Sequence, residues 1–325
     1  TTDDMKAGAI AKLTNNKTIT VTTGTGIVVK GAGTATVDGT GTIDVTGTGT
    51  GINIAGTGKT TVTGANIKLS GAGTGINATG NVTLDDIAIT FDDATAAGKG
   101  IVYDGGTTKA EASISVTNDM ALAKSGAIGI KATMSNKDTS TLVIKTGSIA
   151  TDTGATGILV TGGSDLGAGT TTATVTTTLG ETVGTGVEVA GKANNDITVN
   201  LENTKTATAT SETTKAEVSG TGVEIANGSN GIINIDVKQS NLQVANDGNL
   251  VNIGTVAGTA TVDINNNVEL VGTGNLVNIG VITGTTNVNI NQDVDFAKDA
   301  TGNIVKADAI TAGTLNVNLN VKEGS

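Results

Sequence analysis

The chain has 325 residues and a formal net charge of −11, and it contains no His, Cys, Pro or Trp. All 19 of its basic residues are Lys, so it lacks imidazole bases, thiolates, guanidinium forks, cysteine–histidine zinc clusters and disulfides. Its acidic balance, with one Tyr and two Phe, argues against the positive field and stacking platforms of nucleic-acid binding, and we expect no nucleic-acid partner.

A short aliphatic segment, which we call the anchor, recurs along the whole chain, and most copies are separated by about the 26 positions that separate its two identical copies. Gly248–Gly254 and Gly274–Gly280 share the sequence Gly-Asn-Leu-Val-Asn-Ile-Gly and lie 26 positions apart, and Thr50–Ile54 is a looser copy. In chain order, the first inward residue of each copy is predicted to be Ile27, Ile52, Ile76, Ile101, Ile130, Ile158, Val187, Val223, Val251, Val277 and Val305. Such a repeat predicts a solenoid, in which each unit buries its apolar face only against its neighbours.

Within each repeat, aliphatic residues alternate with polar ones in short runs, and this alternation predicts strands. A second strand follows the anchor at Thr34–Val37, Thr60–Thr63, Ser113–Val116, Thr172–Val175, Asn234–Val237 and Asn316–Leu319. A third strand follows at Ile43–Val45, Ile67–Leu69, Ile87–Ile89, Leu242–Val244, Val268–Leu270 and Val294–Phe296. Ile19–Val21 is predicted to be the third strand of a rung that has lost its beginning. The sequence thus predicts an all-β, right-handed parallel β-helix with three strands per rung and about 11–12 rungs.

The unbroken repeat predicts one elongated domain over residues 1–325, with a loop insertion at about 202–215. Both ends have the same Gly-, Thr-, Val- and Asn-rich composition as the middle of the chain, and neither forms a polar cap. We therefore expect the chain to be a segment of a longer array. No apolar run approaches the roughly 18 residues of a membrane span, and the first residues show no secretory signal pattern.

Gly56–Thr60 reads Gly-Thr-Gly-Lys-Thr, which matches the end of a phosphate-binding loop. The full motif needs Gly where Asn53 stands, and it needs a helix to follow, whereas Thr61–Thr63 continues as a strand pattern. We therefore interpret this segment as a corner between strands.

Four carboxylates cluster at Asp85, Asp86, Asp92 and Asp93. Such a cluster can hold Ca²⁺ or supply the two carboxylates of a polysaccharide hydrolase, and the latter is the main enzymatic alternative. The Arg and His partners common in such sites are missing, so a solvated turn is the simpler interpretation. We assign no catalytic residue, no metal and no cofactor.

Outward Thr-x-Thr pairs on the second strands, such as Thr61 and Thr63, are typical of ice-binding solenoids. A flat ice-binding face needs the pair in every rung, and here it gives way to pairs such as Asn287 and Asn289. High β-propensity and solubility account for this texture, and ice binding is a third alternative.

Departures from the regular step indicate where partners bind, because loops can extend from a solenoid without disturbing its stack. The longest step, from Val187 to Val223, contains the candidate contact residues Glu202, Asn203, Thr204, Lys205, Glu212 and Lys215. A smaller swelling contributes Asp104, Lys109 and Glu111, and another spans Gly162–Thr170. The alternative is that these insertions are merely tolerated, since extending a loop costs little.

With its Thr-Gly-Ile-Asn-Ile and Gly-Asn-Leu-Val-Asn-Ile-Gly anchors, the chain resembles the passenger regions of the very large fusobacterial type V autotransporter adhesins. The resemblance covers the whole chain and implies a non-enzymatic β-helical stalk that binds host cells or partner bacteria. It also implies an extracellular location at the bacterial surface, with membrane contact only through a C-terminal barrel that this sequence lacks. The expected partner is a protein or glycan receptor, and the expected state is a monomer.

Overall fold

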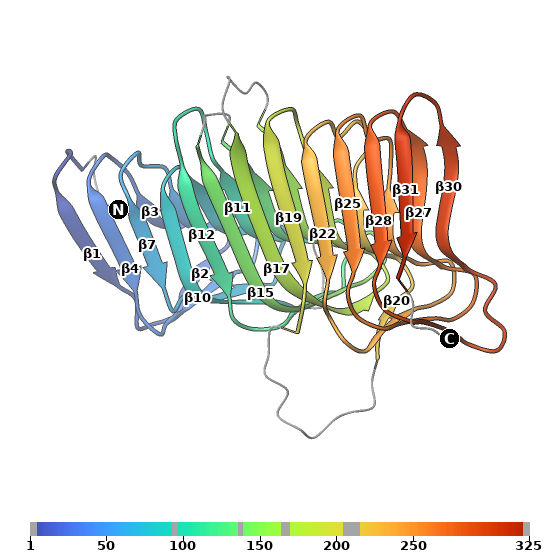
Figure 1. The fold of residues 1–325 in the computed structure, drawn as a ribbon. Helices are drawn as coiled ribbons and strands as arrows, with labels where there is room; N and C mark the ends of the chain where they lie inside the picture. Colours follow the sequence, from blue (N-terminus) through green and yellow to red (C-terminus); the bar gives the residue numbers. More distant parts are fainter. Residues whose placement is uncertain (1–4, 93–96, 136–138, 164–169, 204–214, 321–325) are drawn as a thin grey trace.

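The computed structural model describes residues 5–92, 97–135, 139–163, 170–203 and 215–320. All the regular secondary structure in these residues is β-strand, and every pairing between the strands is parallel. Successive strands stack side by side from one end of the molecule to the other (Figure 1). The chain is therefore a β-solenoid of about eleven turns, which confirms the predicted all-β parallel β-helix.

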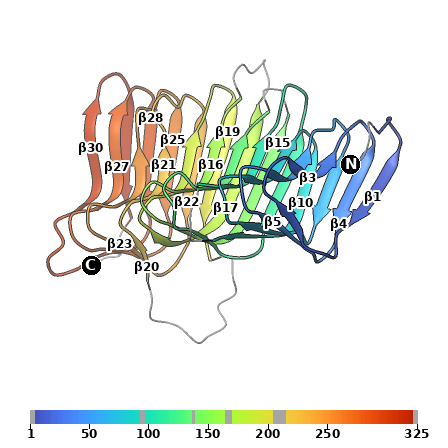
Figure 2. The ribbon, with the colours of Figure 1, turned by 180° about the vertical axis from the view of Figure 1, so that it is seen from behind.

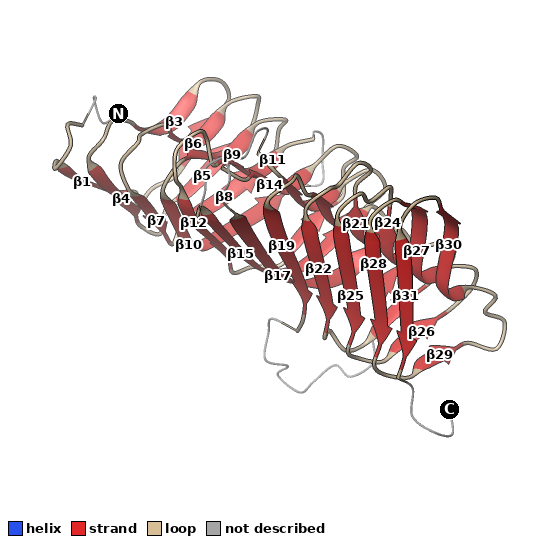
Figure 3. Cartoon of the chain, turned by 45° about the horizontal axis from the view of Figure 1, so that its top comes forward, coloured by secondary structure: helices blue, strands red, loops and turns tan. Residues whose placement is uncertain are grey.

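The strands line three faces, and the anchor strands form the first (Figure 3). Face 1 contains β3 (Thr25–Val29), β6 (Thr50–Ile54), β9 (Thr74–Thr79), β11 (Lys99–Asp104), β14 (Ile128–Thr133), β16 (Thr156–Thr161), β18 (Thr185–Ala190), β21 (Thr221–Ile225), β24 (Asn249–Ile253), β27 (Asn275–Ile282) and β30 (Asn303–Ile310). These eleven strands form one continuous sheet in chain order, as predicted from the anchors.

Face 2 follows face 1 along the chain and carries the longer strands at the front of Figure 1. It contains β1 (Ile10–Thr14), β4 (Thr34–Asp38), β7 (Thr60–Thr63), β10 (Val82–Phe91), β12 (Glu111–Val116), β15 (Thr141–Thr151), β17 (Thr171–Thr182), β19 (Asn195–Leu201), β22 (Ile232–Val237), β25 (Thr259–Ile264), β28 (Thr285–Ile290) and β31 (Thr314–Leu319). Face 3 contains β2 (Ile19–Val21), β5 (Thr42–Val45), β8 (Asn66–Leu69), β13 (Met120–Leu122), β20 (Ala216–Val218), β23 (Leu242–Val244), β26 (Val268–Leu270) and β29 (Val294–Phe296).

Three strands, β10, β15 and β17, run from face 2 into face 3 without a break, so these two faces count as one sheet. The sequence suggests separate short strands, but here the chain bends through shifts in register, between Leu84 and Ile87 in β10 and between Lys145 and Ser148 in β15. A register shift turns a strand locally without ending it, which explains why no turn motif marks these corners.

The core is a set of inward columns, one for each face. The predicted inward anchors from Ile52 to Val277 are almost completely buried, and each pairs with the equivalent residue of the next rung. In the repeated heptapeptide, Val251 and Ile253 are buried while Asn252 is half-buried on the outside. The repeated sequence is thus a stacking anchor, as its alternation predicts.

A column of glycines lies beside the anchors of face 1. Gly51, Gly75, Gly100, Gly129 and Gly157 each precede an inward residue, and a Cβ atom there would lie 2.4–2.5 Å from the carbonyl oxygen of the next rung. Real Cβ atoms do not approach that closely, so only Gly allows adjacent rungs to stack at this position. In later rungs buried Leu250 and Leu276 take the equivalent place, and there the interior accommodates a side chain.

The first rung holds a strand that sequence reasoning missed. Ile10–Thr14 forms β1 and pairs with β4, so Ile19–Val21 is preceded by a face 2 strand of its own rung. Its inward residues are Ala11 and Leu13, whereas Ile10 points outward and is 85% exposed. An outward Ile beside an inward Ala inverts the usual alternation, and the pattern therefore did not indicate a strand.

Candidate functional site

The long insertion falls in the sequence between a strand of face 2 and a strand of face 3. β19 ends at Leu201, and the chain returns at Lys215 to begin β20. Of the predicted contact residues, Thr204, Lys205 and Glu212 lie outside the described residues, as does most of the smaller swelling within 162–170. The structure therefore shows the base of the insertion, on which Glu202, Asn203 and Lys215 lie.

A buried glutamine that the sequence did not single out fills the gap at this base. The Leu179 N–H donates to Gln239 Oε1 over 2.7 Å, and Gln239 Nε2 donates to the Leu179 carbonyl over 2.7 Å. The two residues are 60 positions apart, two rungs along the stack, and Gln239 is only 2% exposed. In the intervening rung, the described strands give Leu179 no partner, because β19 ends at Leu201 and β20 pairs with β17 only at Thr182. The glutamine amide therefore takes the place of a strand as the hydrogen-bond partner of Leu179.

Asn118 performs the same role at another corner. Its side-chain amide accepts from the Ile89 N–H and donates to the Ile89 carbonyl, both over 2.7 Å. Both amides lie where a rung turns and a neighbouring backbone loses its strand partner. Sequence reasoning missed them because the groups they satisfy lie 29 or 60 residues away.

Two predicted contact residues bind the described ends of the insertion to neighbouring rungs. Asn203 Oδ1 accepts from the Ser240 N–H over 2.9 Å, and Lys215 Nζ forms an ion pair with Glu269 Oε2 at 2.7 Å. The Glu202 carbonyl accepts from the Thr178 hydroxyl over 2.7 Å. The described ends of the insertion are therefore fixed to the stack by neighbouring rungs.

The smaller swelling contains a turn and an exposed ion pair. Asp104 caps the turn by accepting from the Gly106 N–H over 2.9 Å, and Lys109 pairs with Glu111 at 3.2 Å. Tyr103 lies buried beneath, where its hydroxyl donates to the Gly80 carbonyl over 3.0 Å. Burial, with a smaller contribution from the charge of Asp104, raises the pKa of Tyr103 well above its usual value, so the phenol stays neutral.

A hollow of about 470 Å³ opens on the outer surface of face 2 beside this swelling. Lys109 and Glu111 line it together with Lys59 and Ser113, so the structure brings two predicted contact residues together with the lysine of the phosphate-loop-like motif. Thr60 begins strand β7 directly after Lys59, which confirms that the motif is a corner. Sequence reasoning assessed Lys59 only as a phosphate ligand, and it missed its place in this hollow.

The carboxylate cluster is divided between two corners of one rung. Asp85 and Asp86 lie where β10 turns from face 2 to face 3, and Asp86 accepts from the Thr117 hydroxyl over 3.0 Å. Asp92 follows the far end of β10, six residues or about 20 Å of extended strand away, and pairs with Lys68 at 3.2 Å. Asp93 lies outside the described residues. Asp92 is therefore not brought together with the other two.

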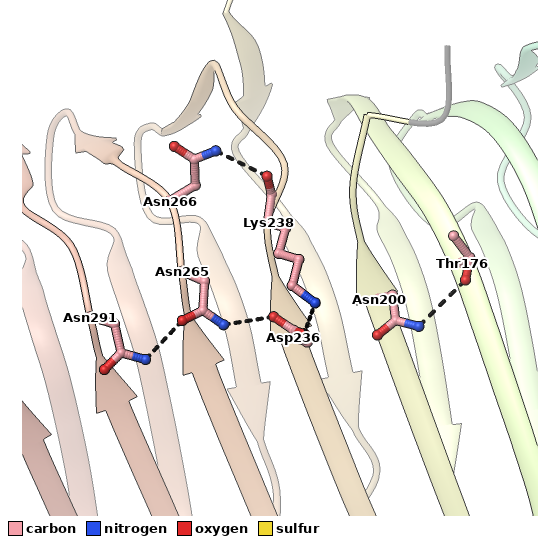
Figure 4. Close-up of polar contacts among 7 residues, drawn as sticks. All are labelled: Thr176, Asn200, Asp236, Lys238, Asn265, Asn266 and Asn291. Atoms are coloured by element: carbon pink, nitrogen blue, oxygen red, sulfur yellow. Dashed lines mark hydrogen bonds and ion pairs between the residues drawn. The ribbon is translucent and has the colours of Figure 1, made fainter. Parts of the chain in front are cut away.

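Outward amides in the C-terminal rungs bond to one another along the stack, and we call each such row an amide ladder. In Figure 4, Asn291 donates to Asn265 and Asn265 donates to Asp236, each over 2.8 Å. A second ladder runs from Asn318 through Asn289 to Asp263, and a third runs from Asn278 through Asn252 to Glu224. Most of their polar groups are engaged between rungs, with the buried Asn278 Oδ1 as an exception, and this favours a structural role for this part of the surface.

The third amide ladder ends at a pair of stacked carboxylates. Glu224 pairs in register with Glu188 of the preceding rung and accepts from Asn252 over 2.6 Å. Burial and the nearby Glu188 charge raise the pKa of Glu224, and the bond from Asn252 opposes this only in part. Because the folded state holds this proton more tightly than the unfolded state, Glu224 lowers stability progressively as pH rises above its unfolded-state pKa.

We therefore expect Glu224→Gln to stabilise the protein at pH 7 by about 0.5 to 1 kcal/mol, because its amide can still accept from Asn252 and can donate to Glu188. The gain should shrink as pH falls toward about 4, where Glu224 is mostly protonated in both the folded and the unfolded state. Urea unfolding at both pH values measures this, with Glu181→Gln, an exposed change of equal charge, as the control. Equal gains from both variants would show that only net charge matters.

Among the described residues, no group of three or more acidic, His or Cys side chains is arranged to hold a metal ion. The same residues contain no helix long and apolar enough to cross a membrane. Comparison of the chain with models of protein families, with curated proteins and with solved structures gave no match in any of the three.

Proposed function

We propose that this chain is a rigid, non-enzymatic stalk segment of a bacterial surface adhesin of the fusobacterial type V autotransporter kind, which displays contact loops at its corners. The observation that carries the proposal is the stack itself: in the described part of the chain, the eleven strands of face 1 pair one after another in chain order. At about 4.8 Å per strand, its ten intervals give a rod about 48 Å long.

The surface supports a role as a spacer. Neighbouring rungs are joined by parallel pairing along face 1 and face 2 and along most of face 3, as the view from behind in Figure 2 lets the reader follow. In the C-terminal rungs, amide ladders on the outside, one of them drawn in Figure 4, add further bonds between rungs. Parallel strands fixed on both sides resist bending, and hydrogen-bonded polar columns keep the surface soluble. A stalk needs these two properties, and the Gly-Asn-Leu-Val-Asn-Ile-Gly resemblance supports the same class.

The location is tested by labelling intact cells of the source bacterium. Antibodies raised against the purified chain should stain unpermeabilised cells, and brief protease treatment of those cells should remove the staining. Staining that appears only after permeabilisation would contradict the proposal. Release of shortened chains from a panel of neutral and acidic polysaccharides by the purified chain would instead favour the enzymatic alternative.

The contact role of the insertion is tested by replacing residues 204–214 with a short Gly-Asn-Gly linker. We expect the thermal midpoint to change by no more than about 2 °C, because the Asn203–Ser240, Gln239–Leu179 and Lys215–Glu269 contacts all remain. Binding of fluorescent beads coated with each protein to host cells and partner bacteria gives the functional result. Equal binding by both proteins would show that the insertion is incidental.

A further inference from the structure

The hollow on face 2 differs from the rest of the outer surface in shape. Its floor is formed by outward residues of three successive strands, β10, β12 and β15, where Thr83 and Ser113 are short, and Lys59 borders it from the corner before β7. Longer side chains, Lys59, Lys109 and Glu111, line it beside them. Its volume of about 470 Å³ falls within the range of small-molecule sites.

Several polar groups of this hollow have no protein partner in the described chain, in contrast to those of the C-terminal amide ladders. Within the described chain, the hydroxyls of Thr83, Ser113 and Thr141 form no hydrogen bond with protein. Asn81 uses its Oδ1 to accept from the Glu111 N–H over 2.9 Å, which leaves its NH₂ group without a protein acceptor among these residues. The hollow therefore presents several unused donors and acceptors at fixed spacing on a rigid sheet.

The charges of the hollow favour an anion, although the whole chain is acidic. Lys59 forms no ion pair in the described part of the chain. Lys109 pairs with Glu111, but both side chains are more than half exposed, so the pair contributes little and can exchange partners. A carboxylate from a ligand can take the place of Glu111 beside Lys109, and Glu111 is then available to accept from a ligand hydroxyl.

One apolar surface completes the site. Val143 pairs in register with Ser113, in a column of outward Ser and Thr residues, and is 46% exposed on the floor of the hollow. It offers its methyl groups to the C–H face of a ring. A peptide that binds as an added strand has no place here, because β10 and β12 already have parallel partners on both sides.

We infer that this hollow binds a carboxylated sugar, with its carboxylate between Lys59 and Lys109, its hydroxyls on Thr83, Ser113, Asn81 and Glu111, and its ring on Val143. The inference goes beyond the proposed function, since a free sugar acid binds or fails to bind whether or not the chain is part of an adhesin. The two are tested separately: loss of sugar binding leaves the surface location and the stalk intact.

The test is a titration of the purified chain, followed by NMR, with 3′-sialyllactose and with a tetrasaccharide of glucuronate and N-acetylglucosamine. The matched neutral probes are lactose and the same tetrasaccharide with its carboxylates reduced to alcohols. We expect saturable binding of at least one acidic probe, with shifts confined to β7, β10, β12 and β15, and at least about tenfold weaker binding of its neutral partner. Absence of saturable binding of both acidic probes, or equal binding of the neutral ones, would overturn the inference.

Variants locate the site. We expect Lys59→Gln and Lys109→Gln each to weaken binding about fivefold, and Ser113→Phe, which fills the hollow from an exposed position, to abolish it. Lys145→Gln is the control, because it removes the same charge from β15 outside the hollow and should change affinity less than twofold. If a folded Ser113→Phe variant binds the acidic sugars with unchanged affinity, the sugars bind outside the hollow and the inference is wrong. If a tetraglutamate peptide binds as tightly as the sugars, the site recognises negative charge and not the sugar, and this result also overturns the inference.

Discussion

Replacing Gly157 with Ala is expected to destabilise the protein by about 3 kcal/mol or more, at or above the upper end of the usual cost of overpacking a core. The new Cβ would lie 2.4 Å from the Gly186 carbonyl oxygen and 2.5 Å from Ile149 Cγ2. Neither atom can move away, because the Gly186 carbonyl belongs to the backbone of the adjacent rung and the Ile149 side chain is completely buried. Relief therefore requires two rungs to separate, which breaks hydrogen bonds of the face 1 sheet.

Equilibrium unfolding in urea gives the loss, and amide hydrogen exchange shows whether opening is confined to the rungs beside β16. Gly280→Ala is the matched control: its nearest neighbour would be 3.4 Å away, so it should change stability by less than about 0.5 kcal/mol. If both variants unfold together with the unaltered protein, the glycine column does not limit the spacing of the rungs.

Replacing Gln239 with Leu is expected to cost about 2 to 6 kcal/mol, because the Leu179 N–H and carbonyl would both remain buried without partners. Leucine has a similar volume, so the loss reports the hydrogen bonds more than the packing. Gln243→Leu, on the outer side of β23, changes the same residue type without burying an unsatisfied backbone group and serves as the control. Comparable losses in the two variants would contradict the bridging role.

Gln239→Glu separates the two bonds of this bridge. A carboxylate at this position accepts from the Leu179 N–H but cannot donate to the Leu179 carbonyl, whereas a protonated carboxyl can do both. Burial raises the pKa of such a group, so the folded variant binds its proton more tightly than the unfolded chain. Its stability should approach that of the unaltered protein below about pH 4 and fall as pH rises above that value. A deficit that does not depend on pH would contradict this account.

The repeating part of the fold could be predicted from the sequence because its cause is local. Each anchor alternates inward and outward residues, as in Val251 and Asn252, and this alternation specifies a strand and its buried side without any knowledge of its neighbours. Corners are harder to predict from the sequence. β15 passes from one face to the next at Thr146 and Gly147, where a register shift bends the chain without a turn motif.

The candidate site could be predicted only in part. Lys109 and Glu111 were found because they interrupt the regular step, but Lys59 lies two rungs away, and only the stacking of the rungs brings it to the same hollow. Gln239 is a stronger case, since its partner is 60 residues distant and is needed because the described strands of the rung between them do not pair with Leu179. Such contacts depend on the order and register in which the rungs stack, and the alternation of residues within one strand does not specify either.

The carboxylates at the ends of the amide ladders also bear on misfolding. Because Gly248–Gly254 and Gly274–Gly280 are identical, an error that displaces the coil by one whole turn would keep every anchor buried in that pair. In the native order, Asn252 donates to Glu224 and Asn289 donates to Asp263, whereas a displaced coil would bring amide groups against different neighbours. An acid at one end of each of the three rows described above therefore distinguishes otherwise equivalent turns, and it penalises exchange of turns between neighbouring molecules during folding.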